Sequence, residues 1–331
     1  MPIDWKPFLD IVAANRKFVL TSHVRPDADA LGSELAMAEL LEAHDCDVRI
    51  INASETPLNL TFLDPDERII RYRKGANADD LSRADVHIVL DTGSWVQLAQ
   101  VGRAMRKLTV QRVVIDHHVS SDDLGAVEFR DATAEATGAL IFDLAQSWGH
   151  TFSPQTAAAL YCAIATDTGW FRFSSTTGET MRRAGQLVDA GAVPHMVYRS
   201  LYEQHRAARV HLAGCALSRV KTESDGLLAF TYLEWEDFER LDAMPADAED
   251  LVNYCLSIAG TKAAFIAVGL QDKRIKISFR SRGTVDVAAV AEGFDGGGHK
   301  QASGAIVDGP MANALRLITD TMKTAVESAA E

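Results

Sequence analysis

The chain has 331 residues, of which 47% are hydrophobic and 24% are charged, so its length and composition predict roughly two globular domains with substantial cores. Its formal net charge of −13 argues against a broad basic surface for long nucleic acids, but is compatible with a small basic pocket for a short anion. No apolar run is long enough for a membrane helix, and the first residues lack a signal-peptide pattern. The cysteines lack zinc-site spacing. We therefore expect a cytoplasmic protein with reduced cysteines and no membrane partner.

The first half of the chain alternates short apolar runs with segments of helical character. This pattern predicts strands at 18–22, 48–52, 86–90 and 112–115, and helices at 4–16, 34–41, 154–164 and 180–190, with a further helix that begins within 134–140. Strands that alternate with helices are typical of a doubly wound, mostly parallel sheet. We therefore predict an α/β fold for this half.

Residues capable of metal binding follow three of these strands. Asp116-His117-His118 comes directly after the fourth strand, Asp91 after the third, and the segment His23 to Asp29 after the first. Asp167 ends a helix that is almost wholly apolar, where a buried charge needs a partner. Because α/β sheets bind ligands at the carboxyl ends of their strands, we expect these side chains to point into one crevice.

Each of these features also has a simpler explanation when it is taken alone. A histidine pair occurs by chance in surface loops, and Asp27 or Asp29 could cap a helix. Asp91 could serve a turn, and Asp167 could pair with Arg172. One cap does not explain both aspartates together with His23, however, and mixed imidazole and carboxylate ligands suit a moderately hard divalent ion such as manganese.

The second half contains shorter apolar runs and a glycine-rich segment. We expect strands at 227–232, 263–270 and 274–281, and the alternation of charged and apolar residues in the last of these predicts an edge strand. The run Gly296, Gly297, Gly298 and His299 leaves backbone amides accessible to an anion, and Arg280 is a suitable basic partner. The predicted domains are residues 1–191 and 213–331, with 192–212 as the connector.

Taken together, these motifs resemble the DHH phosphoesterase superfamily. His23-x-x-Pro26-Asp27-x-Asp29, Asp91, Asp116-His117-His118 and Asp167 match its four motifs, while Phe279-Arg280-Ser281 and the segment 296–299 resemble its DHHA1 domain. Among its members the chain is most similar to the NrnA-type enzymes, which are related to RecJ. Gln301 and Ala28 depart from the usual pattern without removing a ligand.

The resemblance implies a site for two divalent metal ions, most simply Mn²⁺, in a cleft between the catalytic domain and a smaller C-terminal α/β DHHA1 domain. One metal would be bound by His23, Asp27 and Asp91, and the other by Asp29, Asp91, His117 and Asp167. His118 would face the substrate phosphate, with Asp116 orienting a ligand imidazole. The terminal phosphate of the substrate would be bound by Arg280, Ser281, Gly296, Gly297, Gly298 and His299.

The implied activity is hydrolysis of short single-stranded oligonucleotides (nanoRNA and dinucleotides) to mononucleotides, removal of the 3′-phosphate of pAp, or both, through attack by metal-activated hydroxide. No long duplex partner is expected, and a homodimer is compatible with the resemblance. A cyclic di-AMP or pApA phosphodiesterase is the main alternative, and a nucleotide sensor without catalytic activity is the alternative from a different class. A RecJ-like exonuclease and a manganese pyrophosphatase fit the length and the C-terminal motifs less well.

Overall fold

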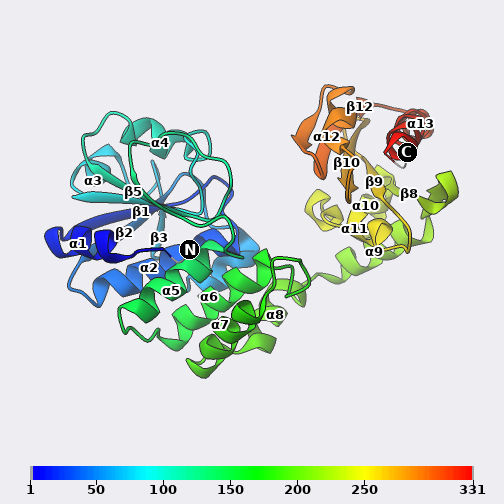
Figure 1. The fold of residues 1–331 in the computed structure, drawn as a ribbon. Coiled ribbons are helices and arrows are strands. Elements are labelled where there is room, and N and C mark those ends of the chain that lie inside the picture. Colours follow the sequence, from blue (N-terminus) through cyan, green and yellow to red (C-terminus); the bar gives the residue numbers. More distant parts are fainter. Residues whose placement is uncertain (1–2, 330–331) are drawn as a thin grey trace. The chain divides into compact units, whose positions relative to one another are not determined.

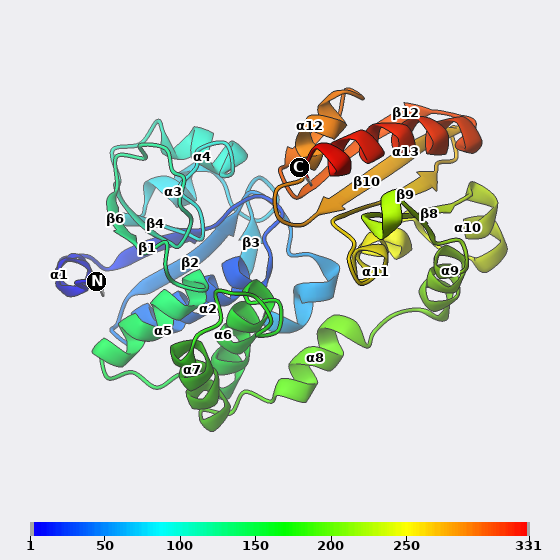
Figure 2. The same ribbon diagram turned by 45° about the vertical axis from the view of Figure 1, so that its right-hand side comes forward.

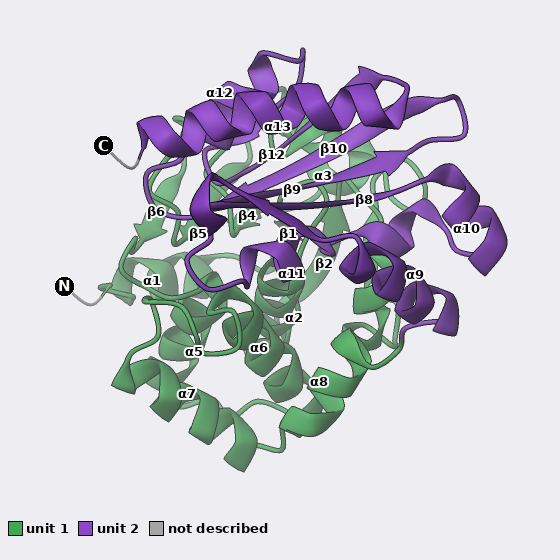
Figure 3. Ribbon diagram, turned by 90° about the vertical axis from the view of Figure 1, so that its right-hand side faces the viewer, with its two compact units in different colours: residues 1–204 green, residues 205–331 purple. Residues whose placement is uncertain are grey.

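The computed structural model describes residues 3–329 and divides into two compact units, Met1–Gln204 and His205–Glu331, which Figure 3 shows in green and purple. The division falls inside the predicted connector 192–212, and most of this segment is helical rather than extended, since it contains α8 (Pro194–Tyr202) and the start of α9 (Ala207–Ser218). The domain boundaries 1–191 and 213–331 stay predictions.

Unit 1 is built on a six-stranded sheet with the order β3-β2-β1-β4-β5-β6, in which every neighbouring pair is parallel. Its strands are β1 (Lys17–Thr21), β2 (Asp47–Asn52), β3 (Ile69–Arg71), β4 (Val86–Leu90), β5 (Gln111–Asp116) and β6 (Val127–Arg130). Its helices are α1 (Lys6–Ala14), α2 (Ala28–Glu42), α3 (Ala78–Ser82), α4 (Ala99–Met105), α5 (Thr137–Ser147), α6 (Pro154–Asp167), α7 (Gly178–Asp189) and α8, with a 3-10 turn at Leu58–Leu63. The prediction of a doubly wound parallel sheet is confirmed.

Helices cover both faces of this sheet (Figure 1). One face packs on α1, α2 and α5, with α6 beyond them, and its core includes Phe18, Leu20 and Ile88. The other face packs on α3 and α4 through Val19 and Val89. Because successive residues of a strand point to opposite faces, a strand buried on both sides is apolar on both sides, as β4 is except for His87, whose Nε2 is hydrogen-bonded to the Leu81 carbonyl. Polar side chains can then reach solvent only where these strands end.

Unit 2 contains a second six-stranded sheet with the order β11-β12-β10-β9-β8-β7, in which only β8 and β9 pair in parallel. Its strands are β7 (Lys221–Glu223), β8 (Leu228–Leu233), β9 (Ala263–Gly269), β10 (Arg274–Ser281), β11 (Gly297–His299) and β12 (Ala302–Asp308). Its helices are α9, α10 (Trp235–Leu241), α11 (Val252–Leu256), α12 (Val287–Glu292) and α13 (Met311–Ser328), with 3-10 turns η2 (Ser224–Gly226) and η3 (Pro245–Ala248).

The two faces of the second sheet are covered differently. Helices α12 and α13 pack on one face through Phe265, Ile277 and Phe279, and α9, α10 and α11 pack on the other (Figure 2). The prediction that residues 274–281 form an edge strand is wrong, because β10 lies inside the sheet between β9 and β12. Its alternation of charged and apolar residues arises from one buried face and one partly open face. Within residues 3–329, no helix combines the length and hydrophobicity that a transmembrane span requires.

Candidate metal centre

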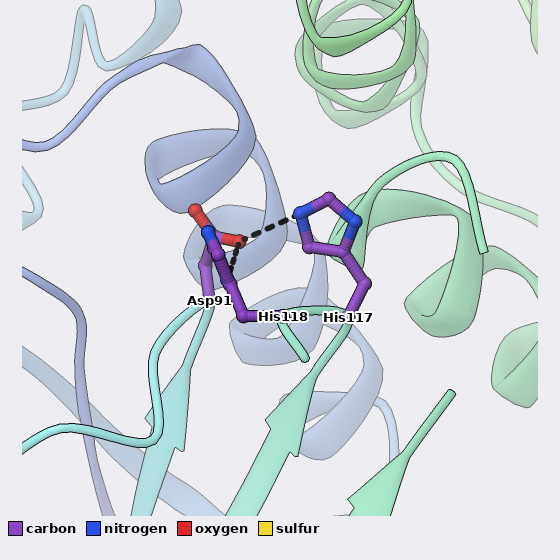
Figure 4. Close-up of side chains that lie close together, drawn as sticks. All are labelled: Asp91, His117 and His118. Carbon is purple, nitrogen blue, oxygen red and sulfur yellow. Dashed lines mark ion pairs between the residues drawn. The ribbon is translucent and has the colours of Figure 1, made fainter. Parts of the chain in front are cut away.

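The predicted metal ligands of unit 1 gather at the carboxyl edge of its sheet. His23 follows β1, Asp91 follows β4, and His117 follows β5, while Asp167 is the last residue of α6. The sheet order places β1, β4 and β5 side by side. Figure 4 shows how Asp91 faces the two histidines that follow β5: its Oδ1 lies 3.6 Å from His117 Nε2 and 3.8 Å from His118 Nδ1.

The two aspartates after β1 are placed by helices rather than by a loop. Asp27 caps α2, because its Oδ1 accepts hydrogen bonds from the backbone amides of Asp29 (3.0 Å) and Ala30 (3.1 Å). Asp29 lies two residues further, in the first turn of α2, and is buried, and its carboxylate accepts from the amides of Thr137 (2.7 Å) and Gly138 (2.8 Å) at the start of α5. Asp27 therefore both caps α2 and is a candidate ligand, whereas Asp29 is a candidate ligand that does not cap α2. Two free backbone amides of a neighbouring helix fix the direction of Asp29.

Asp91 is the most constrained residue of the group. It is buried, its backbone has the left-handed φ of 60° that a non-glycine residue rarely adopts, and its Oδ1 accepts a hydrogen bond from the Thr137 hydroxyl at 2.9 Å. His23 Nε2 lies 3.3 Å from its other carboxylate oxygen. Backbone strain of this kind is held by the surrounding structure and is concentrated at functional sites. Asp91 thus presents one oxygen to each side of the crevice.

The ring orientation of two histidines is set by main-chain carbonyls. His23 Nδ1 donates to the carbonyl of Val24 at 3.0 Å, and His117 Nδ1 donates to the carbonyl of Ala134 at 3.2 Å. Each ring consequently directs Nε2 toward the carboxylates, and His117 Nε2 lies 3.4 Å from Asp167 Oδ2. A histidine that binds metal usually donates its other ring nitrogen in this way, which fixes its tautomer.

His118 has a different environment. Its Nδ1 lies 2.8 Å from Asp116 Oδ1, which also accepts the His118 backbone amide, and its side chain is 52% exposed. Asp116 is buried, and its second oxygen lies 3.6 Å from Arg130 Nε. The hydrogen bond and charge of Asp116 raise the pKa of His118 against the effect of its burial. His118 therefore presents Nε2 outward while Asp116 orients the ring.

Burial and mutual repulsion disfavour ionisation of the carboxylates. Burial raises the pKa of Asp91 well above its usual range and that of Asp167 to about 7, and the charge of Asp29 adds to both effects. Burial also raises the pKa of Asp29. For His23, burial lowers the pKa, but hydrogen bonds and charges from Asp27 and Asp91 outweigh it and raise the pKa to about 11. The carboxylates need a positive charge among them.

These donors fit a divalent cation. Three groups have ligand atoms that lie within 4.8 Å of one another: Asp91 with His117 and His118, His23 with Asp27 and Asp91, and Asp29 with His117 and Asp167. Buried carboxylates that repel one another are stabilised by a cation, and together with imidazole nitrogens, which bind metal on losing their proton, they suit a moderately hard one. The structure thus brings all the predicted ligands of unit 1 together, and they could hold metal.

The predicted substrate residues of unit 2 lie on neighbouring strands of the second sheet. His299 on β11 pairs with Ala302 on β12, and Ala302 pairs with Arg280 on β10. Residues paired across a sheet share a face, so His299 and Arg280 project to the same side. Ser281 projects to the opposite, buried side, where its hydroxyl donates to the carbonyl of Val285 at 2.7 Å. The structure groups Arg280 with His299 and separates Ser281 from them.

The three glycines differ in what requires them. A Cβ at Gly296 would lie 2.3 Å from the carbonyl oxygen of Gly304, and Gly298 has a φ of +146° and no space for a Cβ. Both glycines are therefore needed for packing. A Cβ at Gly297 would meet no atom within 4 Å, so nothing in the fold requires glycine there. Its missing side chain leaves a bare stretch of backbone on the face that carries Arg280.

Three supporting residues were not predicted from the sequence. Thr137 and Gly138 hold Asp91 and Asp29, and Arg130 lies against Asp116 from the end of β6. Thr137 begins a helix that the sequence did indicate, and a helix start near a metal site is a usable signal. The position of Arg130 depends on the pairing of β5 with β6, in which Asp116 lies opposite Arg130, and no local pattern reveals this.

Two protein families match the chain. Residues 17–164 match the DHH family, N-terminal domain, and residues 228–328 match the DHHA1 domain. The chain is 27% identical over 292 residues to the Bacillus subtilis protein named bifunctional oligoribonuclease and PAP phosphatase NrnA, which covers 87% of this chain and 88% of that protein. The protein of the same name from Thermus thermophilus is 28% identical over 291 residues, covering 88% of this chain and 84% of its own.

A solved structure extends the similarity to nearly the whole fold. The crystal structure of an exopolyphosphatase-related protein from Bacteroides fragilis superimposes with a TM-score of 0.89 at 27% identity and covers 98% of this chain and 97% of its own. A doubly wound unit with clustered carboxylates and imidazoles, followed by a smaller mixed-sheet unit, defines a hydrolase that acts on phosphoester bonds. Residues 17–164 therefore form a DHH-family N-terminal domain, and residues 228–328 form a DHHA1 domain.

Proposed function

We propose that this protein hydrolyses short single-stranded oligonucleotides to mononucleotides and removes the 3′-phosphate of pAp. The proposed cofactors are two divalent metal ions, with manganese as the preferred metal. The observation that carries the proposal is the arrangement of His23, Asp27, Asp29, Asp91, His117 and Asp167 in groups of ligand atoms that share Asp91 and His117. The names of the relatives, which include an oligoribonuclease and a PAP phosphatase activity, support the substrate class.

In this proposal the shared ligand is Asp91. One ion would be held by His23, Asp27 and Asp91, and the other by Asp29, Asp91, His117 and Asp167. When bound, such a pair would supply positive charge for the phosphoryl oxygens and a means of activating water. The backbone amides of Thr137 and Gly138 hold the Asp29 carboxylate, so a ligand meets an arrangement that is already formed.

His118 supplies a proton donor to the reacting phosphate. Its Nδ1 is engaged by Asp116, so Nε2 is the ring nitrogen that can donate to a phosphoryl oxygen. Asp116 acts as a positioning residue, and Arg130 stabilises the buried Asp116 carboxylate. A donor aimed at the oxygen on which charge develops stabilises the transition state more than the ground state.

Unit 2 determines which phosphoesters are bound. Arg280 and His299 project from one face of its sheet and flank bare backbone at Gly297, an arrangement suited to a terminal phosphate. We assign Ser281 to the folding of β10 rather than to the substrate, because its hydroxyl is buried and donates to Val285. A requirement for a phosphate end restricts activity to short substrates, in accord with the net charge of −13.

The test is a turnover panel with the purified protein and manganese. It compares a 5′-phosphorylated RNA dinucleotide, pAp, a strand several times longer, cyclic di-AMP and pyrophosphate. We expect fast turnover of the dinucleotide and pAp, with the longer strand slower by at least about a hundredfold. Cyclic di-AMP as the best substrate would overturn the proposed substrate class. Manganese binding without turnover of any compound would indicate a nucleotide sensor rather than an enzyme.

A further inference from the structure

Unit 2 contains a cavity that the phosphate site does not use. Its volume is about 260 Å³, and it lies on the face of the sheet that carries Arg280, between strands β9 and β10 and the segment from η3 to α11. Aliphatic side chains, among them Ala248, Val252, Ile266 and Val268, form its floor. Pockets for drug-sized ligands are about 300–1,000 Å³, so a cavity of this size suits one nucleobase with its ribose rather than a dinucleotide.

Polar groups without intramolecular partners surround this apolar floor. Lys276 and Ser278 project into the cavity from β10, and Glu249 and Asp250 line its rim. Among residues 3–329, nothing forms a hydrogen bond or ion pair with the side chains of Lys276, Ser278 or Glu249, and Asp250 reaches only Arg280, at 3.9 Å. A few unpaired polar groups around an apolar floor are the signature of a small-molecule site.

The cavity is continuous with the proposed phosphate site along the sheet. Lys276, Ser278 and Arg280 alternate along one face of β10, and Ser278 pairs with Gly304, which in turn pairs with Gly297. Two glycines, Gly304 and Gly297, leave this row without side chains between the cavity and β11, while Ala302 occupies the next row. Arg280 lines the cavity and also shares a row with His299. A ligand with a phosphate near Arg280 would therefore direct its next group into the cavity.

We propose that this cavity binds the nucleobase of the nucleotide whose phosphate is bound by Arg280 and His299, and that it selects bases with an exocyclic amino group. The proposal rests on the proposed function for the position of the phosphate. The carboxylates of Glu249 and Asp250 accept hydrogen bonds, as does the Ser278 hydroxyl, so they match the amino groups of adenine, cytosine and guanine. Uracil presents a carbonyl oxygen at the corresponding position and would face the carboxylates unfavourably.

Equilibrium binding tests the cavity independently of hydrolysis. Calorimetric titrations of the full chain in the presence of a chelator compare AMP, UMP and ribose 5-phosphate. We expect AMP to bind about tenfold more tightly than either of the others, since only AMP both fills the cavity and pairs with its rim. Equal affinities for AMP and ribose 5-phosphate would overturn the proposal, because the base would then contribute nothing.

Three variants locate the effect. Ser278→Leu fills the cavity and should remove the advantage of AMP, while Ser278→Ala leaves the cavity open and should retain most of it. Glu249→Ala changes an exposed side chain, so the fold should be preserved, and the ratio of AMP to UMP affinity should fall toward one. An unchanged preference in both Ser278→Leu and Glu249→Ala, with thermal midpoints like that of the wild type, would place the base elsewhere and overturn the proposal.

Turnover of a base-free substrate separates this proposal from the proposed function. Bis(4-nitrophenyl) phosphate with manganese reports the metal centre alone, so its turnover by the wild type shows whether that centre is active independently of base recognition. A preference for AMP without turnover of any oligonucleotide would support the cavity and contradict the proposed function. Turnover of dinucleotides at the same KM whether the bases are adenine or uracil would support the function and overturn the base selection.

Discussion

The two units build their sites by opposite means. In unit 1, strand ends and helix termini bring charged side chains together, and the carboxylates of Asp29 and Asp91 are buried at a cost that their raised pKa values express. In unit 2, the central feature is a missing side chain, because Gly297 leaves backbone accessible on the face that carries Arg280 and His299. The carboxylates of unit 1 repel one another strongly, whereas the site in unit 2 contains almost no repulsion between like charges.

The difference predicts different consequences of substitution. A charge placed among like charges serves chemistry at the expense of stability, so its removal should abolish turnover and stabilise the metal-free fold. A bare backbone face serves recognition, so its obstruction should weaken binding and leave both chemistry and stability nearly intact.

The largest effect is expected for Asp91→Ala. If Asp91 is shared by both metal groups, this change should lower turnover on the order of a thousandfold or more and reduce the manganese content measured by elemental analysis. The isosteric Asp91→Asn should also raise the unfolding midpoint of the metal-free protein, because burial disfavours the ionised aspartate. Near-normal turnover of either variant would remove Asp91 from the metal centre.

The next effect is expected for Arg280→Ala. Loss of a guanidinium that binds a terminal phosphate should raise the KM for a phosphorylated dinucleotide about tenfold to a hundredfold, with little change in kcat. A generic phosphodiester without a terminal phosphate should be hydrolysed as before. An equal loss of kcat/KM on both substrates would indicate that Arg280 acts in the chemical step. The two units would then not differ in the way proposed.

A smaller effect should separate two adjacent glycines. Gly297→Ala places a methyl group in open space, so the protein should fold normally while its KM for the dinucleotide rises severalfold. Gly296→Ala places the same group 2.3 Å from the Gly304 carbonyl oxygen and should lower the unfolding midpoint instead. If both variants lost stability and kept the wild-type KM, the glycines at 296 and 297 would serve the fold alone and not substrate binding.

The smallest effect on turnover is expected at Glu34, a buried carboxyl of α2 whose Oε2 accepts from Asn52 at 2.8 Å. Burial raises the pKa of the Glu34 carboxyl in the folded protein from 4.5 to about 7. Between these pH values the carboxyl is ionised in the unfolded chain but protonated in the folded protein, so the free energy of unfolding falls as pH rises. Glu34→Gln should therefore gain stability over the wild type up to about 3 kcal/mol above pH 7, and little at pH 4.5. Urea unfolding at both pH values measures this gain; a gain that does not depend on pH would show that Glu34 ionises normally.

The parallel sheet of unit 1 and its ligand edge were predictable because both follow from short-range patterns. Apolar runs locate β1, β4 and β5, and parallel pairing then requires their carboxyl ends to meet. The position of Asp29 was less accurate, since α2 begins at Ala28 and makes Asp29 part of the helix rather than of a loop. Helix starts are hard to locate where two aspartates can each act as the cap.

What the sequence did not reveal depends on contacts between distant segments. The strands β3 and β6 were not predicted, because both are short and only partly buried. The direction of Ser281 follows from the register of β10 with β9 and β12, and a shift of one residue would exchange it with Arg280. The inner position of β10 was missed because a cavity on one face produces the same alternation as a solvent-exposed edge.

The hydrogen bonds of Asp29 have a consequence for reading related sequences. The residue before α5, Ala136, provides no side-chain cap, and Asp29 accepts the first two amides of that helix from α2. A cap of this kind contributes about 1 kcal/mol, so selection for folding alone can retain an aspartate here after catalysis is lost. Asp91 offers the fold no such benefit, since it is strained and repelled by its neighbours. In a homologue of unknown activity, the aspartate equivalent to Asp91 is therefore the more informative sign of a working enzyme.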